Sequence, residues 1–412
     1  MSVVASGRRR KVLMLTRLFP SRAFPTFGTF CAERARALAP HAEVRVMVPT
    51  PYFPAWLPGP AAWKQWARVE RDGVFGEDIP VSYPRYVSPP GIATWLQGVA
   101  MAARVRREFA ARHPGWVPDV IDAHFAFPDG YAALSLGRSL GVPVVVTCHG
   151  SDLRQYPDIP IAGAMTRRVL CEADRVVAVS SELLQASLRL GCPPERAQSL
   201  SNGVDPRKFA LRDKASCRAR LGLPLARKIG VCVANLVEVK GQSLLLQALA
   251  ELRRQGGEAP LLVLVGDGPC RARLEREAEA LEAAGDVMFV GRRAHYEVAV
   301  WMGAADWLLL SSHAEGWPTV YFEAMACGRP VITTAVSAAR DAICRPEYGI
   351  VVEPRTPQAF AAAIAAASLS DYDEGFIRAH AEAHSWERWA ETALDIFDQA
   401  GAGRAAGETN EG

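Results

Sequence analysis

Short apolar runs rich in β-branched residues recur along the chain, with helix-length stretches between them. This rhythm predicts parallel β-strands joined by helical crossovers. The predicted strands of the first half are 11–16, 43–48, 120–123, 144–147 and 175–179. The rhythm then restarts, with predicted strands at 229–234, 261–265, 287–290, 307–310 and 331–333. The predicted fold class is therefore α/β, with two Rossmann-like domains.

The same pattern divides the chain. Residues 1–205 are predicted to form the N-terminal domain and residues 206–383 the C-terminal one, with the charged, strand-poor segment 202–228 as linker. Residues 384–400 predict an amphipathic helix that packs back on the N-terminal domain, with Trp386, Trp389, Ala393 and Phe397 near one stripe. The small and polar residues after it are expected to fray.

Composition excludes several classes of protein. Half of the 412 residues are hydrophobic, as in a globular protein with a large core. The apolar run after the basic start is too short for a secretory signal, and the long uncharged stretches 46–63 and 86–103 are broken by Pro and Gly, so no transmembrane helix is expected. The nine cysteines are odd in number and form no C-x-x-C pair, which argues against a disulfide framework or zinc site and fits a reducing cytoplasm.

Charge is distributed unevenly along the chain. Residues 1–205 carry a net charge of +7 and residues 206–412 one of −4, which together give the net +3. The first half would therefore meet an anionic surface or ligand, although a surface bias without a partner is equally compatible with the count.

The segment "HAEGWPTVYFEAMACGRP" holds two glutamates after the predicted strand 307–310. Pro318 suits the first turn of a helix, and the following Gly and Pro suit its end, so a helix is predicted from about 318 to 327. Glu315 then lies in the loop that leaves the strand, and Glu323 lies inside the helix.

In an open α/β sheet, ligands bind beyond the carboxyl ends of the strands, where a helix start favours anions. A diphosphate is therefore predicted at Pro318, Thr319 and Val320. The two carboxylates would repel it, so they are expected to bind neutral hydroxyls. A molecule with hydroxyls on both sides of a diphosphate is a nucleotide sugar.

The motif "EGWPTVYFE" resembles the E-x7-E motif of the family 4 retaining glycosyltransferases. Further segments that resemble the family follow its order: "LFPSRAFPTFGTF", "HGSD", "NGVD", Lys240–Gly241 and "GDGP". The resemblance implies the GT-B fold, in which two Rossmann-like domains face each other across a cleft. It also implies transfer of a sugar from a UDP- or GDP-sugar to an acceptor with retention at the anomeric carbon.

The resemblance implies roles for individual residues. Gly28 would let the backbone approach the diphosphate, and Lys240 would neutralise the departing diphosphate. His149 would lie against the donor sugar, Glu315 would bind its hydroxyls and Glu323 the ribose. A turn glycine, a solvated lysine and a structural histidine are the alternatives at the first three positions.

The chain departs from the family at two places. Asn235 stands where the family commonly has arginine, so one cation on the leaving diphosphate is missing. Arg17 and Arg22 are the candidate replacements, and Asp152 is placed with them on the acceptor side. The loop 337–341 also lacks the glycines that the family often has.

No metal or separate cofactor is expected. Asp371 and Asp373 form a D-x-D sequence, but no predicted strand precedes them, so a solvated turn is the preferred interpretation. The donor sugar nucleotide is the only co-substrate predicted, and no nucleic acid partner is expected.

The acceptor is predicted from the first half of the chain. Segments 53–66 and 88–109 place tryptophans beside Lys and Arg, with Trp95, Val99, Ala102 and Phe109 near one helical stripe and Arg104, Arg106 and Arg107 close by. This composition suits an anionic lipid–water boundary, and core packing is the alternative. The prediction is a cytoplasmic, possible peripheral membrane enzyme that acts on a glycan or lipid-linked saccharide in polysaccharide synthesis. A non-catalytic sugar-nucleotide binder and a sugar-nucleotide epimerase remain the alternatives.

Overall fold

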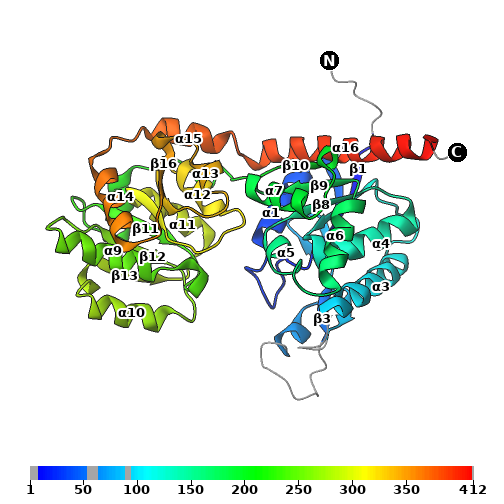
Figure 1. The fold of residues 1–412 in the computed structure, drawn as a ribbon, viewed down its shortest axis with the longest axis horizontal. Coiled ribbons are helices and arrows are strands. Elements are labelled where there is room, and N and C mark those ends of the chain that lie inside the picture. Colours follow the sequence, from blue (N-terminus) through cyan, green and yellow to red (C-terminus); the bar gives the residue numbers. More distant parts are fainter. Residues whose placement is uncertain (1–7, 53–63, 89–93, 411–412) are drawn as a thin grey trace. The chain divides into compact units, whose positions relative to one another are not determined.

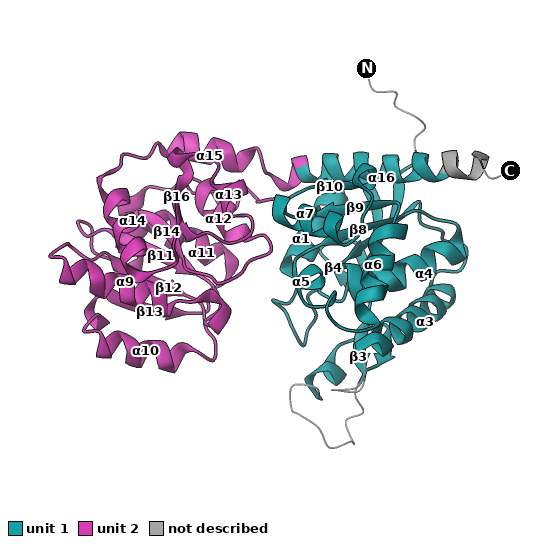
Figure 2. Ribbon diagram, viewed as in Figure 1, with its two compact units in different colours: residues 1–201, 389–412 teal, residues 202–388 magenta. Residues whose placement is uncertain are grey.

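The computed structural model describes residues 8–52, 64–88 and 94–410. The chain forms two compact units, one of residues 1–201 and 389–412 and one of residues 202–388 (Figure 2). In each unit, helices surround a mainly parallel β-sheet (Figure 1). The predicted α/β class with two Rossmann-like domains is confirmed. The sequence-based division fell at 205/206, and the compact units divide at 201/202.

The first unit contains an eight-stranded sheet in the order β10-β9-β8-β7-β1-β2-β5-β4. All neighbours are parallel except β4 and β5. A separate parallel pair joins β3 and β6. The strands are β1 (Arg10–Leu15), β2 (Ala42–Met47), β3 (Thr50–Tyr52), β4 (Asp72–Phe75), β5 (Ile79–Ser82), β6 (Arg85–Val87), β7 (Val120–His124), β8 (Val144–Cys148), β9 (Arg175–Ala178) and β10 (Ala197–Ser199).

The second unit contains a six-stranded parallel sheet in the order β13-β12-β11-β14-β15-β16. Counted along the unit this is 3-2-1-4-5-6, the order of a doubly wound nucleotide-binding sheet. The strands are β11 (Ile229–Val233), β12 (Leu261–Val265), β13 (Val287–Gly291), β14 (Trp307–Leu310), β15 (Val331–Thr334) and β16 (Gly349–Val352). The order reverses between β11 and β14, and in the first unit it reverses between β1 and β7.

The helices cover the faces of these sheets. In the first unit they are α1 (Thr29–Leu38), α3 (Thr94–Arg112), α4 (Tyr131–Leu140), α5 (Ser151–Arg154), α6 (Ala162–Glu172), α7 (Ser181–Arg189) and most of α16 (Trp386–Asn410). In the second unit they are α8 (Lys214–Leu221), α9 (Ser243–Arg254), α10 (Arg271–Ala280), α11 (His295–Ala304), α12 (Thr319–Ala326), α13 (Ala339–Ala342), α14 (Pro357–Leu369) and α15 (Glu374–Glu382).

The ten predicted strands are present, with ends shifted by at most one residue. The pattern missed β3, β4, β5, β6, β10 and β16, which are only three or four residues long; β5, in addition, contains Pro80. The prediction that 202–228 is a linker was wrong. This segment contains α8, and Phe209, Cys217 and Arg218 are buried in the second unit.

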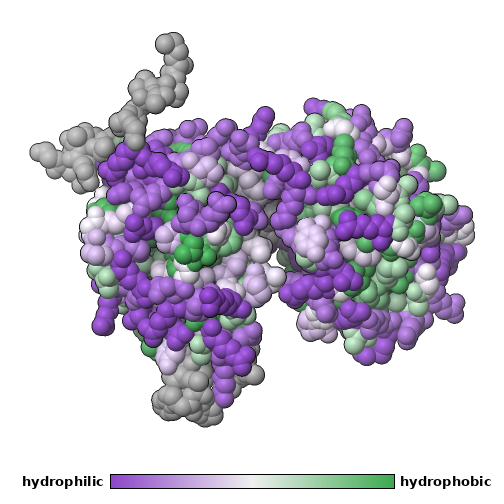
Figure 3. All heavy atoms as spheres, turned by 180° about the vertical axis from the view of Figure 1, so that it is seen from behind, coloured by the Kyte–Doolittle hydropathy of each residue, from purple (hydrophilic) through white to green (hydrophobic). Residues whose placement is uncertain are grey.

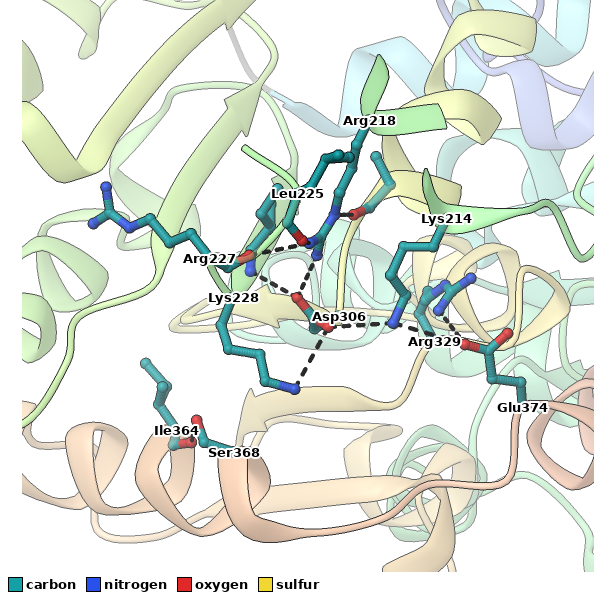
Figure 4. A network of polar contacts seen from close by, with 12 residues as sticks. Lys214, Arg218, Leu225, Arg227, Lys228, Asp306, Arg329, Ile364, Ser368 and Glu374 are labelled. Atoms are coloured by element: carbon teal, nitrogen blue, oxygen red, sulfur yellow. Dashed lines mark hydrogen bonds and ion pairs between the residues drawn. The ribbon is translucent and has the colours of Figure 1, made fainter. Parts of the chain in front are cut away.

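A buried carboxylate holds the amino ends of the two central strands of the second unit together (Figure 4). Asp306 precedes β14, and one of its oxygens accepts the N–H of Ile229 at the start of β11 at 2.8 Å. Arg218 pairs with the same oxygen at 2.7 Å, and Lys214 pairs with the other at 3.2 Å. Since only 9% of the Asp306 side chain is exposed, these cations compensate a nearly buried charge.

Helix α16 packs on the first unit, as its apolar stripe predicted. Its buried residues include Trp389, Ala393 and Phe397, and Arg10 donates to the carbonyl of Leu394 at 2.9 Å. Trp386 lies half-buried. The expected fraying after residue 400 was wrong, because the helix continues to Asn410.

On the face drawn in Figure 3, hydrophilic residues dominate and hydrophobic ones form small scattered areas. Among the described residues, no helix is both long and apolar enough to span a membrane. On α3, Ala102 and Phe109 of the predicted stripe are packed in the core together with Gly98 and Met101, whereas Val99 is 42% exposed.

Replacement of Asp306 tests this arrangement. Asp306→Asn should lower the free energy of unfolding at pH 7 by about 3 kcal/mol, because nearby cations lose their partner. Burial alone would raise the pKa of Asp306, but the N–H of Ile229 and the charges of Lys214 and Arg218 lower it overall. The stabilisation is therefore present above the unfolded-state pKa of about 3.9 and is lost as the pH falls through the lower folded-state pKa.

Urea unfolding followed by circular dichroism measures this difference. Asp371→Asn, at an exposed carboxylate of the same unit, is the control and should change little. Equal stability of wild type and Asp306→Asn at pH 7, or a difference that persists undiminished at about pH 2, would contradict this account.

Candidate functional site

The loops after β11 and β14 leave the point where the strand order of the second unit reverses. Lys240 lies in the first loop and Glu315 in the second, and Lys240 Nζ is 2.6 Å from Glu315 Oε1. Ser312 Oγ donates to the same carboxylate oxygen at 2.6 Å. The Glu315 side chain is only 9% exposed, and that of Lys240 is 25% exposed. A cation and a carboxylate thus meet at the position where a doubly wound sheet binds its ligand.

A tight backbone contact fixes this pair. Gly241 has φ +59°, and a Cβ there would lie 2.5 Å from the carbonyl oxygen of Ser311. Ser311 Oγ donates to the Gly241 carbonyl at 2.8 Å, and Arg355 Nη2 donates to the Ser311 carbonyl at 2.9 Å. The glycine after Lys240 is therefore required for the two loops to approach each other.

Asn235 is exposed beyond the carboxyl end of β11. Its carbonyl accepts from Gln242 Nε2 at 3.0 Å. The "GDGP" segment packs directly on this loop, since a Cβ at Gly266 would lie 1.9 Å from the Ala234 carbonyl oxygen and one at Gly268 2.4 Å from that of Leu236. Both glycines are therefore required by the close packing of the two backbones, and Asn235 lies in the loop on which they pack.

Helix α12 begins directly after this region. Pro318 is its N-cap, no side chain caps its start, and Thr319 and Val320 form its first turn. Glu323 is buried in the helix, and His295 Nε2 lies 3.1 Å from its Oε1. This histidine was not predicted from the sequence. Its position at the start of α11, in the first helix after the carboxyl end of β13, was the available signal.

The first unit has a matching pair at its own reversal point. The backbone N–H of Arg17, after β1, donates to Asp129 Oδ1 at 2.6 Å, and Arg17 Nε lies 3.5 Å from Asp129 Oδ2. Arg17 Nη2 also donates to Tyr156 Oη at 3.0 Å. Asp129 is fully buried, and its burial raises the pKa of the carboxyl although Arg17 opposes the shift.

Gly28 and Arg22 are the other predicted site residues in the loop after β1. Gly28 has φ +68°, and a Cβ there would lie 2.2 Å from the carbonyl carbon of Leu18, so only glycine fits this turn. Arg22 is exposed, and its backbone N–H donates to Glu70 at 3.0 Å. The predicted contacts of Gly28, Arg17 and Arg22 with a ligand remain predictions.

His149 follows β8 at the carboxyl edge of the first sheet. Its ring lies 4.8 Å from the ring of Phe30 and 4.8 Å from that of Phe125. Burial, assisted by Arg34 and His124, holds the pKa of His149 well below its ordinary value, so the imidazole is neutral.

The carboxylate of Asp152 binds the backbone of the loop that carries His149. Asp152 is fully buried, and its carboxylate accepts the N–H groups of His149 at 3.2 Å, Gly150 at 2.8 Å and Ala126 at 2.9 Å. Its oxygens are thus directed at the backbone. We therefore assign Asp152 a structural role in place of the acceptor contact expected from the sequence.

The described residues contain no group of three or more His, Cys, Asp or Glu side chains arranged to hold a metal ion. In the D-x-D sequence, Asp373 caps α15 by accepting the N–H of Phe376 at 2.9 Å, and Asp371 is exposed. The loop 337–341 does differ from a glycine turn in sequence, yet Ala338 adopts φ +67°, a conformation that glycine adopts more easily.

Two family patterns match the chain, "Glycosyltransferase Family 4" over residues 28–208 and "Glycosyl transferases group 1" over residues 213–383. The Bacillus subtilis glycosyltransferase TuaC, named for teichuronic acid biosynthesis, is 31% identical over 360 residues, which cover 86% of this chain and 88% of TuaC. The chain belongs to glycosyltransferase family 4. It is therefore an enzyme of the glycosyltransferase class, as the motifs predicted.

Other relatives agree with this family. The D-inositol 3-phosphate glycosyltransferase of Frankia alni is 31% identical over 287 residues, 66% of this family 4 chain and 70% of that protein. Among solved structures, sucrose-phosphate synthase from Thermosynechococcus elongatus has a TM-score of 0.77 at 20% identity, covering 96% of this chain and 100% of that one. Anabaena HepE in complex with UDP has a TM-score of 0.70 at 20% identity, covering 94% and 99%. These structures share the GT-B fold with the family 4 chain.

Proposed function

We propose that this family 4 enzyme transfers a sugar from a UDP- or GDP-sugar to a glycan or lipid-linked saccharide in cell-envelope glycan synthesis, with retention of the anomeric configuration. The observation that carries the proposal is the Lys240–Glu315 pair at the reversal point of the second sheet, beside the uncapped start of α12. HepE structures with UDP and UDP-glucose, and the glycan named for TuaC, support the donor and acceptor classes.

The proposed donor site assigns each group a task. The cation of Lys240 and the N–H groups at Thr319 and Val320 stabilise charge that grows on the diphosphate as the bond to the sugar breaks. Once Lys240 turns to the diphosphate, the Glu315 carboxylate accepts hydrogen bonds from sugar hydroxyls, and Glu323 accepts them from the ribose. The proposed role of His149 is a hydrogen bond with a hydroxyl of the donor sugar.

The anomeric configuration is retained when the nucleotide leaves and the acceptor attacks on the same face of the donor sugar. The acceptor oxygen bonds to the anomeric carbon as the bond from that carbon to the phosphate oxygen breaks, and the departing phosphate takes the acceptor proton. The family membership favours this transfer over the epimerase and the non-catalytic binder. Incubation with donor alone and then with acceptor separates them, because only a transferase needs the acceptor for rapid nucleotide release.

Nucleotide binding is the first test of the proposal. UDP or GDP at one hundred times its dissociation constant should stabilise the protein by about 2.7 kcal/mol, seen as a raised melting temperature. Glu323→Gln, which keeps the shape but removes the charge that binds the ribose, should abolish most of this shift. Glu347→Gln, at an exposed position of the same unit, should leave it intact. A melting temperature that ignores every nucleoside diphosphate would refute the donor site.

A basic cavity on the first unit supports contact with an anionic membrane surface. The cavity has a volume of about 380 Å³, and Arg106 of α3, Arg138 of α4 and Arg168 of α6 line it. Arg138 and Arg168 share one carboxylate, that of Glu172, whereas Arg106 has no acidic partner among the described residues. Of the tryptophans expected at this boundary, Trp56 and Trp63 lie outside the described residues.

Vesicle binding tests the membrane proposal. The protein should bind vesicles with phosphatidylglycerol and bind phosphatidylcholine vesicles weakly, with affinity falling as salt rises because the charges are screened. The triple variant Arg106→Ala, Arg138→Ala, Arg168→Ala should lose binding by about a hundredfold, on the scale of about 1 kcal/mol per cation. Arg276→Ala in the second unit is the control. Equal binding to both vesicle types would contradict electrostatic docking.

A further inference from the structure

Three polar side chains of the first unit, Asp122, His124 and His149, contact one another in a row. Asp122 and His124 are two residues apart in β7, so their side chains point to the same side of the sheet. His149 follows the neighbouring strand β8. His124 Nδ1 lies 3.1 Å from His149 Nε2, and His124 Nε2 lies 3.3 Å from Asp122 Oδ2. Asp122 and His124 are 2% and 0% exposed, so both are removed from water.

The charge of Arg34 decides which nitrogen of His124 carries the proton. Arg34 is buried, donates to Thr147 Oγ1 at 3.2 Å and places Nη1 3.5 Å from His124 Nδ1. Because a guanidinium can only donate, His124 Nδ1 must be an acceptor. The proton of neutral His124 is then on Nε2, the nitrogen that faces the carboxylate of Asp122.

This assignment fixes the tautomer of His149 in turn. Since His124 Nδ1 accepts, His149 Nε2 must donate to it across the 3.1 Å contact. The other ring nitrogen of His149, Nδ1, then carries no proton and can accept a hydrogen bond. The rings of Phe30 and Phe125 pack against the imidazole and hold it in place.

Asp122, His124 and Phe125 carry features that lower the stability of the fold and that packing alone does not explain. The contact between Asp122 Oδ2 and His124 Nε2 has ion-pair distance but not hydrogen-bond alignment, and neither atom has another hydrogen-bond partner among the described residues. Phe125, directly after His124, adopts φ +75°. Buried polar atoms with incomplete partners and strained non-glycine backbone gather at functional sites.

We propose that Asp122 and His124 are positioning residues that hold His149 as the Nε2–H tautomer, so that its Nδ1 accepts a hydrogen bond from a hydroxyl of the donor sugar. The inference rests on the proposed role of His149 at the sugar and adds the two residues that act through it. Arg34 secures the arrangement because it prevents His124 Nδ1 from carrying a proton.

Two replacements of His124 test the proposal. His124→Phe keeps a ring but removes the acceptor, and should lower kcat about 10- to 100-fold with little change in the KM of the donor. His124→Asn places an amide oxygen near the former Nδ1, and should keep most of the activity. His113→Phe, at a half-buried histidine elsewhere in the first unit, is the control and should leave kcat unchanged.

The ¹⁵N chemical shifts of His149 give a readout that needs no donor. The wild type and His124→Asn should show the Nε2–H form, and His124→Phe should show a mixture or the Nδ1–H form. A wild-type His149 protonated at Nδ1, or full activity of His124→Phe, would overturn the proposal. If the tautomer is as expected but wild type neither binds nor turns over any sugar nucleotide, the proposed function fails while the positioning chain stands.

Discussion

In a doubly wound parallel sheet the strand order reverses between two neighbouring central strands. The loops that follow these two strands run to opposite sides, and side chains or a ligand must fill the space between them. In both units of this protein a cation and a carboxylate meet there. Lys240 and Glu315 do so in the second unit, and Arg17 and Asp129 in the first. The remaining features of each site are arranged around these pairs.

The two pairs have different surroundings, and this difference separates their roles. Asp129 is fully buried, and the guanidinium of Arg17 is also bonded to Tyr156, so this pair secures the loops of the first unit. Lys240 keeps a quarter of its side chain exposed next to the start of α12. A lysine in that position can turn from the protein carboxylate to a ligand phosphate. The Glu315 carboxylate, only 9% exposed, then keeps the hydrogen bond from Ser312 and gains those of the sugar hydroxyls.

The sequence predicted the strands and the E-x7-E helix well because apolar periodicity and helix-terminal residues are local signals. It did not predict the edge strands β4, β10 and β16, which are only three or four residues long. It also missed α8, whose buried Arg218 looks like a surface residue until Asp306 is placed beside it. The sequence also missed His124, Asp129 and His295, the partners of the site residues. Each is defined by a contact between elements that are distant in the sequence rather than by a spacing along the chain.

The central claim is that position at the carboxyl end of β11, and not positive charge alone, makes Lys240 functional. The turnover number of Lys240→Met should fall by about two to three orders of magnitude, with a smaller loss of nucleotide affinity, because the charge it stabilises grows in the transition state. Lys228 precedes the amino end of the same strand, and Lys228→Met should keep nearly full turnover. Equal turnover of Lys240→Met and wild type with a sugar-nucleotide donor would contradict the account.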